Sequence, residues 1–281
     1  WIGNSMLRNK KFQIDKLFVT VLVLISGILS AQENKSKFTI QYNPDIVDSW
    51  WLEKNNFGIQ PTKFDFGVNW KLKKDDLTYS INILLQEDQS YIGESFIKYN
   101  FSKKTFLRIG KYYRDFSSYL NDELSSGHML VSHNAQPMSK IGFVSSYKIK
   151  KLKQIDFDFG ISHAVFDINE SYSKAPLLHE KFLYMNIKKD RYRFSIGFIH
   201  EAIWGGNTKD GSMIGKQPNN FKDFLKILIA ADGPDEGGLH ANALGNHLGI
   251  TEFLFQKNND NKILNFYYQH FFEDTSGLRF R

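Results

Sequence analysis

The chain has 281 residues, with 36 lysines and arginines, 30 aspartates and glutamates, and no cysteine. The length allows one large domain or two small ones, and the lack of cysteine excludes a disulfide framework and a thiolate metal site. Half of the formal net charge of +6 lies within the first 31 residues, so the excess in the remainder is too weak to indicate a nucleic-acid partner.

The first 31 residues have the pattern of an export signal behind a few upstream residues. Met6 opens the basic stretch MLRNKKFQIDK, and the mostly apolar run LFVTVLVLISGIL follows, before the small residues Ser30 and Ala31. Such an order is typical of a secretory signal peptide. The apolar run is too short to cross a bilayer as a helix, although an uncleaved anchor or a buried helix would share its composition. We therefore expect residues 1–31 to be upstream sequence plus signal peptide, and the mature chain to begin near Gln32, outside the inner membrane.

From residue 32 onward, apolar and polar side chains alternate in segment after segment. Period-2 alternation predicts strands with one apolar and one polar face, and helical periodicity is scarce. The apolar faces are rich in phenylalanine, tyrosine and tryptophan, and aromatic residues make up 15% of the chain. The predicted strands include KFDFGVNWK (63–71), LTYSINILL (77–85), IDFDFGISHAVF (155–166), RYRFSIGF (191–198) and LNFYYQHFFE (264–273).

Short charged turns mostly alternate with longer connections in the same region. The short turns are expected at 73–76, 102–104, 150–154, 189–190 and 258–261, and the longer connections at about 86–91, 117–138, 168–179 and 205–246. Five hairpins with strands of about 10 residues predict an all-β fold, an antiparallel up-and-down transmembrane β-barrel of outer-membrane type over residues 32–281. A secreted soluble β-sandwich or barrel is the alternative, because alternation alone does not separate the two classes.

The stretch PNNFKDFLKILIAADG, residues 218–233, departs from the strand pattern. Asn220 suits a helix N-cap with Asp223 three residues later, and Gly233 suits the C-terminal end. We therefore expect a short helix within the longest connection, and a strand over 224–231 is the competing interpretation. The apolar face of this helix would contain Phe221, Phe224, Leu225 and Leu228.

Four blocks near the C-terminus carry a family resemblance. The segments HEAIWGGNTKDG, PNNFKDFLKILIAADG, ALGNHLGITEF and NFYYQHFFEDTSGLRFR follow one another in this order. Together they resemble the Wzi-like capsule-assembly family, and members encoded in Bacteroidota are the most similar. The resemblance is strongest over residues 195–281. Before that it rests on the strand rhythm and the export signal.

The resemblance implies a non-enzymatic outer-membrane barrel that binds or organises surface or capsular polysaccharide. Its implied partners are that polysaccharide, outer-membrane lipids and the barrel assembly machinery, with no nucleic acid. In the family further strands follow the block that ends LRFR, so we expect the barrel to be incomplete at the C-terminus. Enterobacterial relatives also carry a helical periplasmic element on the N-terminal side, for which this sequence has no clear counterpart. An outer-membrane porin and a barrel-borne hydrolase acting on glycan or lipid are the alternative functions.

Polar and aromatic residues of these blocks are the candidate glycan ligands. Trp204 offers a flat apolar face on which a sugar ring stacks, although the following Gly205-Gly206 pair also suits a simple turn. Carboxylate, amide and guanidinium groups bind sugar hydroxyls, although a network that is satisfied within a barrel lumen is the alternative for each of them. The full candidate set is Trp204, Asp210, Asn246, His247, Gln269, Glu273 and Arg279.

Metal and catalytic sites find little support in the sequence. The histidines lack the HxxxH and HExxH spacings of zinc sites. Glycoside cleavage needs a pair of carboxyl groups, and the adjacent Glu273 and Asp274 point to opposite faces of a strand. No phosphate loop, dinucleotide fingerprint or serine nucleophile elbow occurs, so we expect neither a cofactor nor a catalytic residue.

Overall fold

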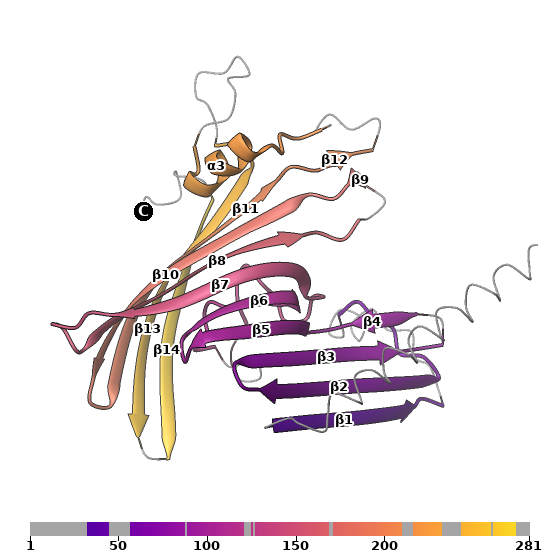
Figure 1. Ribbon diagram of the computed structural model, residues 1–281, viewed down its shortest axis with the longest axis horizontal. Coiled ribbons are helices and arrows are strands. Elements are labelled where there is room, and N and C mark those ends of the chain that lie inside the picture. Colours follow the sequence, from indigo (N-terminus) through magenta and orange to yellow (C-terminus); the bar gives the residue numbers. More distant parts are fainter. Residues whose placement is uncertain are drawn as a thin grey trace, which may run out of the picture.

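The computed structural model describes residues 33–44, 57–87, 89–120, 125, 127–168, 171–209, 216–231, 243–259 and 261–273. The expected signal segment lies outside these ranges. The described residues form a 12-stranded antiparallel sheet, in which the strands follow one another in chain order and β4 pairs beside β3 (Figure 1). The strands are β1 (Glu33–Tyr42), β2 (Phe64–Lys74), β3 (Leu77–Leu85), β4 (Ser90–Ile92), β5 (Ser95–Ser102), β6 (Thr105–Tyr112), β7 (Met138–Lys148), β8 (Ile155–Val165), β10 (Leu177–Lys189), β11 (Tyr192–Trp204), β13 (Asn246–Asn259) and β14 (Lys262–Glu273).

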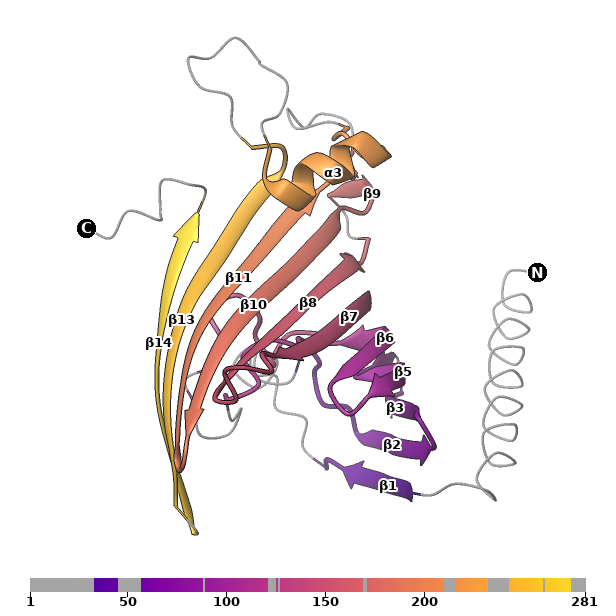
Figure 2. The same cartoon turned by 60° about the vertical axis from the view of Figure 1, so that its left-hand side comes forward.

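Two small elements accompany the large sheet. The strands β9 (Tyr172–Lys174) and β12 (Asn207–Thr208) pair with each other, and the helix α3 (Phe221–Ile229) follows them. The all-β class, the up-and-down order and the short helix are therefore confirmed. The large sheet is strongly curved, but its two ends, β1 and β14, are not paired with each other (Figure 2). The sheet is not closed into a barrel.

Five short turns connect the hairpins that the sequence predicts. They join β2 to β3, β5 to β6, β7 to β8, β10 to β11, and β13 to β14. Two of these turns place an aspartate in the left-handed region, Asp75 at φ 51° and Asp190 at φ 50°. Aspartate tolerates this conformation better than most residues because its short polar side chain bonds locally. Asp75 and Asp190 therefore allow the left-handed backbone conformation of their turns, in addition to being solvated.

The sheet has two chemically different faces. We call the inner face the side against which the described residues of the β6–β7 connection, 113–120 and 127–137, pack, and the outer face the side against which α3 packs. The strand register assigns alternate residues to each face, so that Tyr184 is inner and Leu183 is outer. Large apolar side chains exposed on the outer face include Phe38, Ile40, Tyr99, Phe101, Ile109, Ile141, Phe159, Leu183, Phe194, Phe255, Phe266 and Tyr268.

The principal core lies on the inner face, beneath the β6–β7 connection. Phe116 of this connection packs with Phe182, Tyr184, Ile199 and Ile250 of three neighbouring strands. Close packing here depends on glycines opposite aromatic rings. A Cβ on Gly197 would lie 2.1 Å from the Tyr184 ring, and a Cβ on Gly160 would lie 2.4 Å from the Phe182 ring. These rings cover the glycine backbone of the adjacent strand, an arrangement that also fixes the register.

The helix α3 begins where the sequence predicts but ends earlier than predicted. Asn220 and Asp223 form the predicted capping box, with the Asp223 N–H donating to Asn220 Oδ1 at 2.9 Å. The helix ends at Ile229 with Ala230 in the left-handed conformation, so the prediction of an end at Gly233 is wrong. The C-terminal carbonyls are already satisfied there, because the Ala230 N–H bonds back to Ile227 and Lys226.

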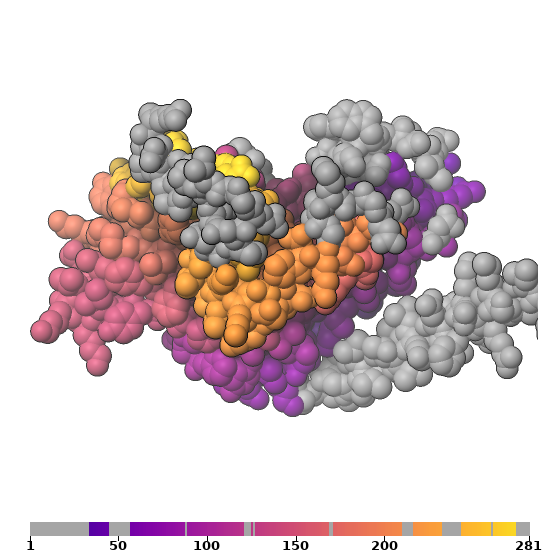
Figure 3. Space-filling view, turned by 90° about the horizontal axis from the view of Figure 1, so that it is seen from above, coloured from indigo at the N-terminus to yellow at the C-terminus, as the bar shows by residue number. Residues whose placement is uncertain are grey.

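The buried face of α3 matches the predicted one only in part. Phe224 and Leu228 are half-buried, and Phe224 packs against the Trp204 ring. Ile227 is fully buried against Ala202 and Leu244 on the outer face of the sheet. Phe221 is instead 73% exposed and Leu225 is 45% exposed. In the view from above, α3 lies at the molecular surface within the orange region (Figure 3). No helix in the described ranges combines the length and the apolarity that crossing a membrane requires.

The capping box leads to a local prediction. Replacing Asn220 by alanine removes the acceptor for the Asp223 N–H, and such a loss costs about 1 kcal/mol. We expect amide hydrogen exchange in the first turn of α3 to become roughly fivefold faster, measured by mass spectrometry. Asn219→Ala, one residue before the cap, is the control and should leave exchange unchanged. Equal exchange in both variants would contradict the capping assignment.

Candidate functional site

Two adjoining cavities lined by charged and polar side chains lie on the inner face. One has a volume of about 600 Å³ and the other about 730 Å³. Glu94, Lys98 and Arg108 line both of them, so the two cavities meet at β5 and β6. The combined space is of the size that binds small ligands or a short stretch of a polymer.

Cations outnumber carboxylates two to one around these cavities. The carboxylates are Asp75, Asp76, Glu94, Asp115 and Asp158. The cations are Lys35, Lys71, Lys73, Lys98, Lys103, Lys104, Arg108, Arg114, Lys188 and Arg193. The local excess is thus concentrated on one face of β1–β6 and the neighbouring inner wall. Such concentration produces a positive potential that attracts anions.

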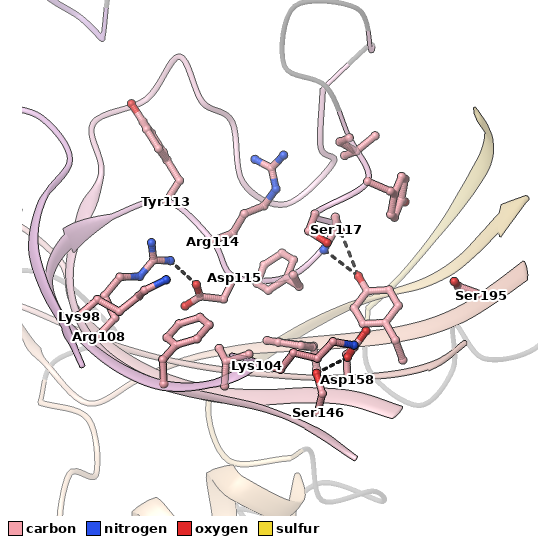
Figure 4. Close-up of a pocket in the computed structure, with 18 of the residues that line it drawn as sticks. Lys98, Lys104, Arg108, Tyr113, Arg114, Asp115, Ser117, Ser146, Asp158 and Ser195 are labelled. Carbon is pink, nitrogen blue, oxygen red and sulfur yellow. Dashed lines mark hydrogen bonds and ion pairs between the residues drawn. The ribbon is translucent and has the colours of Figure 1, made fainter. Parts of the chain in front are cut away.

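The β6–β7 connection forms one wall of the first cavity. Ser117 is 2% exposed, and its backbone N–H donates to the Tyr184 hydroxyl oxygen at 3.0 Å. Its own hydroxyl donates to the Glu252 carboxylate at 2.8 Å. The ring of Phe116 meets that of Phe182 at 5.9 Å between centroids. These contacts hold the start of the connection across the strands, where Tyr113, Asp115 and Ser117 lie over the inner face (Figure 4).

Glu252 is the centre of the buried network behind this wall. It is 1% exposed and accepts hydrogen bonds from Tyr184, Ser117 and Gln269, the last at 2.6 Å. The His128 ring lies 3.4 Å from the same carboxylate. Three separate parts of the chain, β10, β13–β14 and the β6–β7 connection, are joined at this single carboxylate. A buried carboxylate is stable only when its oxygens are satisfied in this way.

An ion pair fixes the junction of the two cavities. The Arg108 guanidinium from β6 bonds to the Asp115 carboxylate of the following connection, and both side chains are largely buried. Burial raises the pKa of Asp115 above its ordinary value, although Arg108 and Lys140 oppose that shift. The guanidinium also lies 3.8 Å from the centroid of the Tyr112 ring. Arg108 is therefore oriented by an anion and an aromatic face together.

Further pairs satisfy the inner wall on either side. Lys140 Nζ lies 2.9 Å from Glu180 Oε2, and both side chains are almost completely buried. Nearer the hairpin turns, Lys188 pairs with Asp156 at 2.5 Å, and Asn186 donates to Asp156 at 2.8 Å. The closed Lys140–Glu180 pair is of the kind that is primarily structural. None of these residues belongs to the predicted ligand set.

Two of the sequence-predicted ligands lie on the outer face, away from both cavities. The Trp204 ring packs near Phe224 of α3 at 6.0 Å between centroids, and its Nε1 finds no acceptor among the described residues. His247 is 3% exposed, and its Nδ1 lies 2.8 Å from His200 Nε2. Its Nε2 lies 2.8 Å from the Leu244 carbonyl oxygen. Both side chains fasten the region of α3 to the sheet.

The other predicted ligands are dispersed. Asn246 lines a separate inner cavity of about 270 Å³, and Gln269 belongs to the Glu252 network. Glu273 lies opposite Leu248 at the end of β14. Asp210 and Arg279 lie outside the described residues. The structure therefore does not gather the predicted set into one site, and none of its described members lines the two basic cavities.

The basic cavity residues had a recognisable signal in the sequence. Lys71 and Lys73 are two residues apart within KLKK, and Lys98 and Arg108 lie in the predicted alternating region. Period-2 geometry alone places Lys71 and Lys73 on one face. What sequence reasoning missed is that Lys98 and Arg108 join them, because this depends on cross-strand register.

The chemistry available at the cavities is binding of anions and of hydroxyl groups by lysines, arginines, serines and amides. Among the described residues, no group of three or more histidines, cysteines, aspartates and glutamates is arranged to hold a metal ion. Neither a family model nor a curated protein nor a solved structure matches the chain.

Proposed function

We propose that this chain forms the wall of an outer-membrane β-barrel that binds or organises surface polysaccharide without catalysing a reaction. The observation that carries the proposal is the separation of the two faces of one curved antiparallel sheet. The outer face presents exposed aliphatic and aromatic residues on strand after strand, and the inner face presents paired charges and polar cavities. Outward apolar and inward polar residues are the pattern of a transmembrane barrel.

The outer face supports the membrane part of the proposal. Phe38 is 66% exposed, Ile40 is 77% exposed and Phe266 is 61% exposed. Apolar surface left in water costs about 25 cal/mol per Å², and soluble monomers rarely expose such continuous patches. Lipid contact removes this cost. The predicted export signal and the resemblance to Wzi-like proteins agree with the same location.

The inner face supports the glycan part. Hydroxyl and amide groups stand among the cations of the second cavity, where Thr78, Asn100 and Ser102 contribute to the lining. Sugar hydroxyls require donors and acceptors of this kind, with charged partners giving the stronger bonds. Charged and hydroxyl-bearing side chains line both cavities, as suits a flexible polar polymer.

Deletion of the gene in its host tests this function. We expect surface polysaccharide to move from the cells to the medium while the total amount stays constant, measured by carbohydrate assay on both fractions. Complementation with the wild-type gene should restore retention. Unchanged fractions would refute the polysaccharide role, and recovery of the protein in the soluble fraction of lysed cells would refute the membrane location.

A pore is the second candidate, and the inward-folded β6–β7 connection is the observation that favours it. A connection packed against the inner face narrows a lumen, as a constriction does in a channel. Planar-bilayer conductance with no effect of gene deletion on polysaccharide retention would favour the pore over the glycan function.

A further inference from the structure

A row of side chains runs across the inner face from β2 to β6. Lys73 lies opposite Thr78, Thr78 lies opposite Lys98, and Lys98 lies opposite Arg108. Neighbouring strands are about 4.8 Å apart, so the row extends over roughly 14 Å. Lys71 lies on the same face as Lys73 and lines the same cavity. We call Lys71, Lys73, Lys98 and Arg108 the basic row.

The basic row places like charges opposite each other, which a sheet ordinarily avoids. Lys98 and Arg108 are directly opposite each other, and Lys71 is directly opposite Lys35 of β1. Like charges in directly opposite positions destabilise an antiparallel pair. A ligand with several negative charges would offset this repulsion. The Asp115 carboxylate offsets part of this repulsion at Arg108, and the lysines of the row carry the remainder.

No described ion pair joins a cavity carboxylate to a lysine of the row, although the Asp115 charge also attracts Lys98. Asp115 is paired with Arg108, and Asp158 lies 3.9 Å from Arg193. Among the described ion pairs, none involves Lys71, Lys73 or Lys98. Lys71 and Lys73 are exposed. Their ammonium groups are available to an anion that enters the cavity.

We propose that the basic row binds an acidic polysaccharide, a polymer whose sugars carry carboxylate groups. The inference rests on the proposed function and adds the chemical class of the glycan. Ammonium and guanidinium groups meet the carboxylates through charge-assisted hydrogen bonds, while Thr78 and Asn100 of the same cavity bind hydroxyls. A row that extends over roughly 14 Å suits repeated charges on a chain better than one small anion.

The aromatic residues beside the row favour a glycan over a single-stranded nucleic acid. Lys98 Nζ lies 4.5 Å from the centroid of the Phe106 ring, and Arg108 Cζ lies 5.0 Å from that of Phe96. These ring faces are occupied by the protein's own cations. Single-stranded nucleic-acid sites need free aromatic faces on which bases stack.

Binding by the full-length gene product in detergent tests the proposal. The probes are polygalacturonate, which carries a carboxylate on each sugar, neutral dextran and single-stranded DNA. We expect calorimetry to show binding of polygalacturonate that weakens as salt is raised, and much weaker binding of the other two. The variant Lys73→Gln/Lys98→Gln should lose at least tenfold in affinity. The matched control is Lys222→Gln/Lys226→Gln on α3, which removes the same charge elsewhere and should leave affinity unchanged.

Three results would overturn the inference. Equal loss of affinity in both double variants would mean that net charge acts without a site. Binding of DNA as tight as that of polygalacturonate would mean a general polyanion surface. Binding of dextran as tight as that of polygalacturonate would remove the carboxylate requirement while leaving a glycan function in place. The gene-deletion experiment is independent of the basic row, so its failure would refute the proposed function separately.

Discussion

Replacing Glu252 by leucine should cause the largest loss of stability that any single inner-face substitution produces. The change leaves the Tyr184 and Ser117 hydroxyls and the Gln269 amide without their shared acceptor in a closed environment. Each buried donor without a partner costs about 1–3 kcal/mol. We expect the free energy of unfolding to fall by about 3–5 kcal/mol, measured by urea titration in detergent with tryptophan fluorescence.

Two further variants make this result specific. Glu252→Gln keeps one acceptor oxygen in place, so its loss should be about half as large. Gln256→Leu lies on the same face of β13, and its side chain has one described partner, Asn265 at 2.9 Å. That control should cost less than about 1 kcal/mol. Limited proteolysis should also cut the β6–β7 connection faster in Glu252→Leu. A loss no greater than that of Gln256→Leu would refute the central role of Glu252.

Gly197→Ala should have the second largest effect. The new Cβ would lie 2.1 Å from Tyr184 Cε1, so the ring has to move. The hydroxyl of this ring holds both Ser117 and Glu252. Overpacking of a filled site costs about 1–3 kcal/mol, and loss of the Tyr184 hydrogen bonds adds to it. We expect a decrease of about 3 kcal/mol in the free energy of unfolding, by the same urea titration.

Gly67→Ala is the matched control for this prediction. Gly67 also lies in a strand, but a Cβ there would meet Thr39 Cβ at an ordinary 3.5 Å. We expect no loss, and a small gain is reasonable because alanine restricts the unfolded chain. Equal unfolding midpoints for Gly197→Ala and Gly67→Ala would show that the Tyr184 ring is not fixed against the glycine.

The local features were predictable because their causes are local. Alternation in residues 77–85 defines a strand within any sheet, since period 2 places the apolar residues on one side. The charged turns at Asp75 and Asp190 follow from the backbone preferences of short polar side chains. The capping box of Asn220 and Asp223 is a contact between residues three positions apart. None of these depends on what the distant chain does.

The orientation of α3 was not predictable in this way. Of the predicted apolar face, Phe224 does pack against Trp204. Phe221 and Leu225 are exposed, and the fully buried Ile227 was not part of the prediction. A helix can pack in several orientations about its own axis when nearly every position on one side is apolar. Contacts with Ala202 and Leu244, from segments distant in the chain, selected one of them.

The candidate site depended on tertiary structure even more strongly. Trp204 and His247 were attractive ligands by residue type, but register places both on the outer face. Lys98 and Arg108 acquired their significance from facing each other across two strands. A shift of one residue in strand register moves every side chain to the opposite face. The residue type alone does not determine the register.

The sequence by itself determined the β class, the positions of the hairpin turns and the capped helix, because short-range periodicity and turn chemistry are encoded in neighbouring residues. Only the tertiary structure decided that the β6–β7 connection folds onto the inner face, that Glu252 joins three parts of the chain, and that the lysines of β2 and β5 form one row with Arg108. Those outcomes are set by cross-strand register and by burial of distant side chains against one another, which no local pattern specifies.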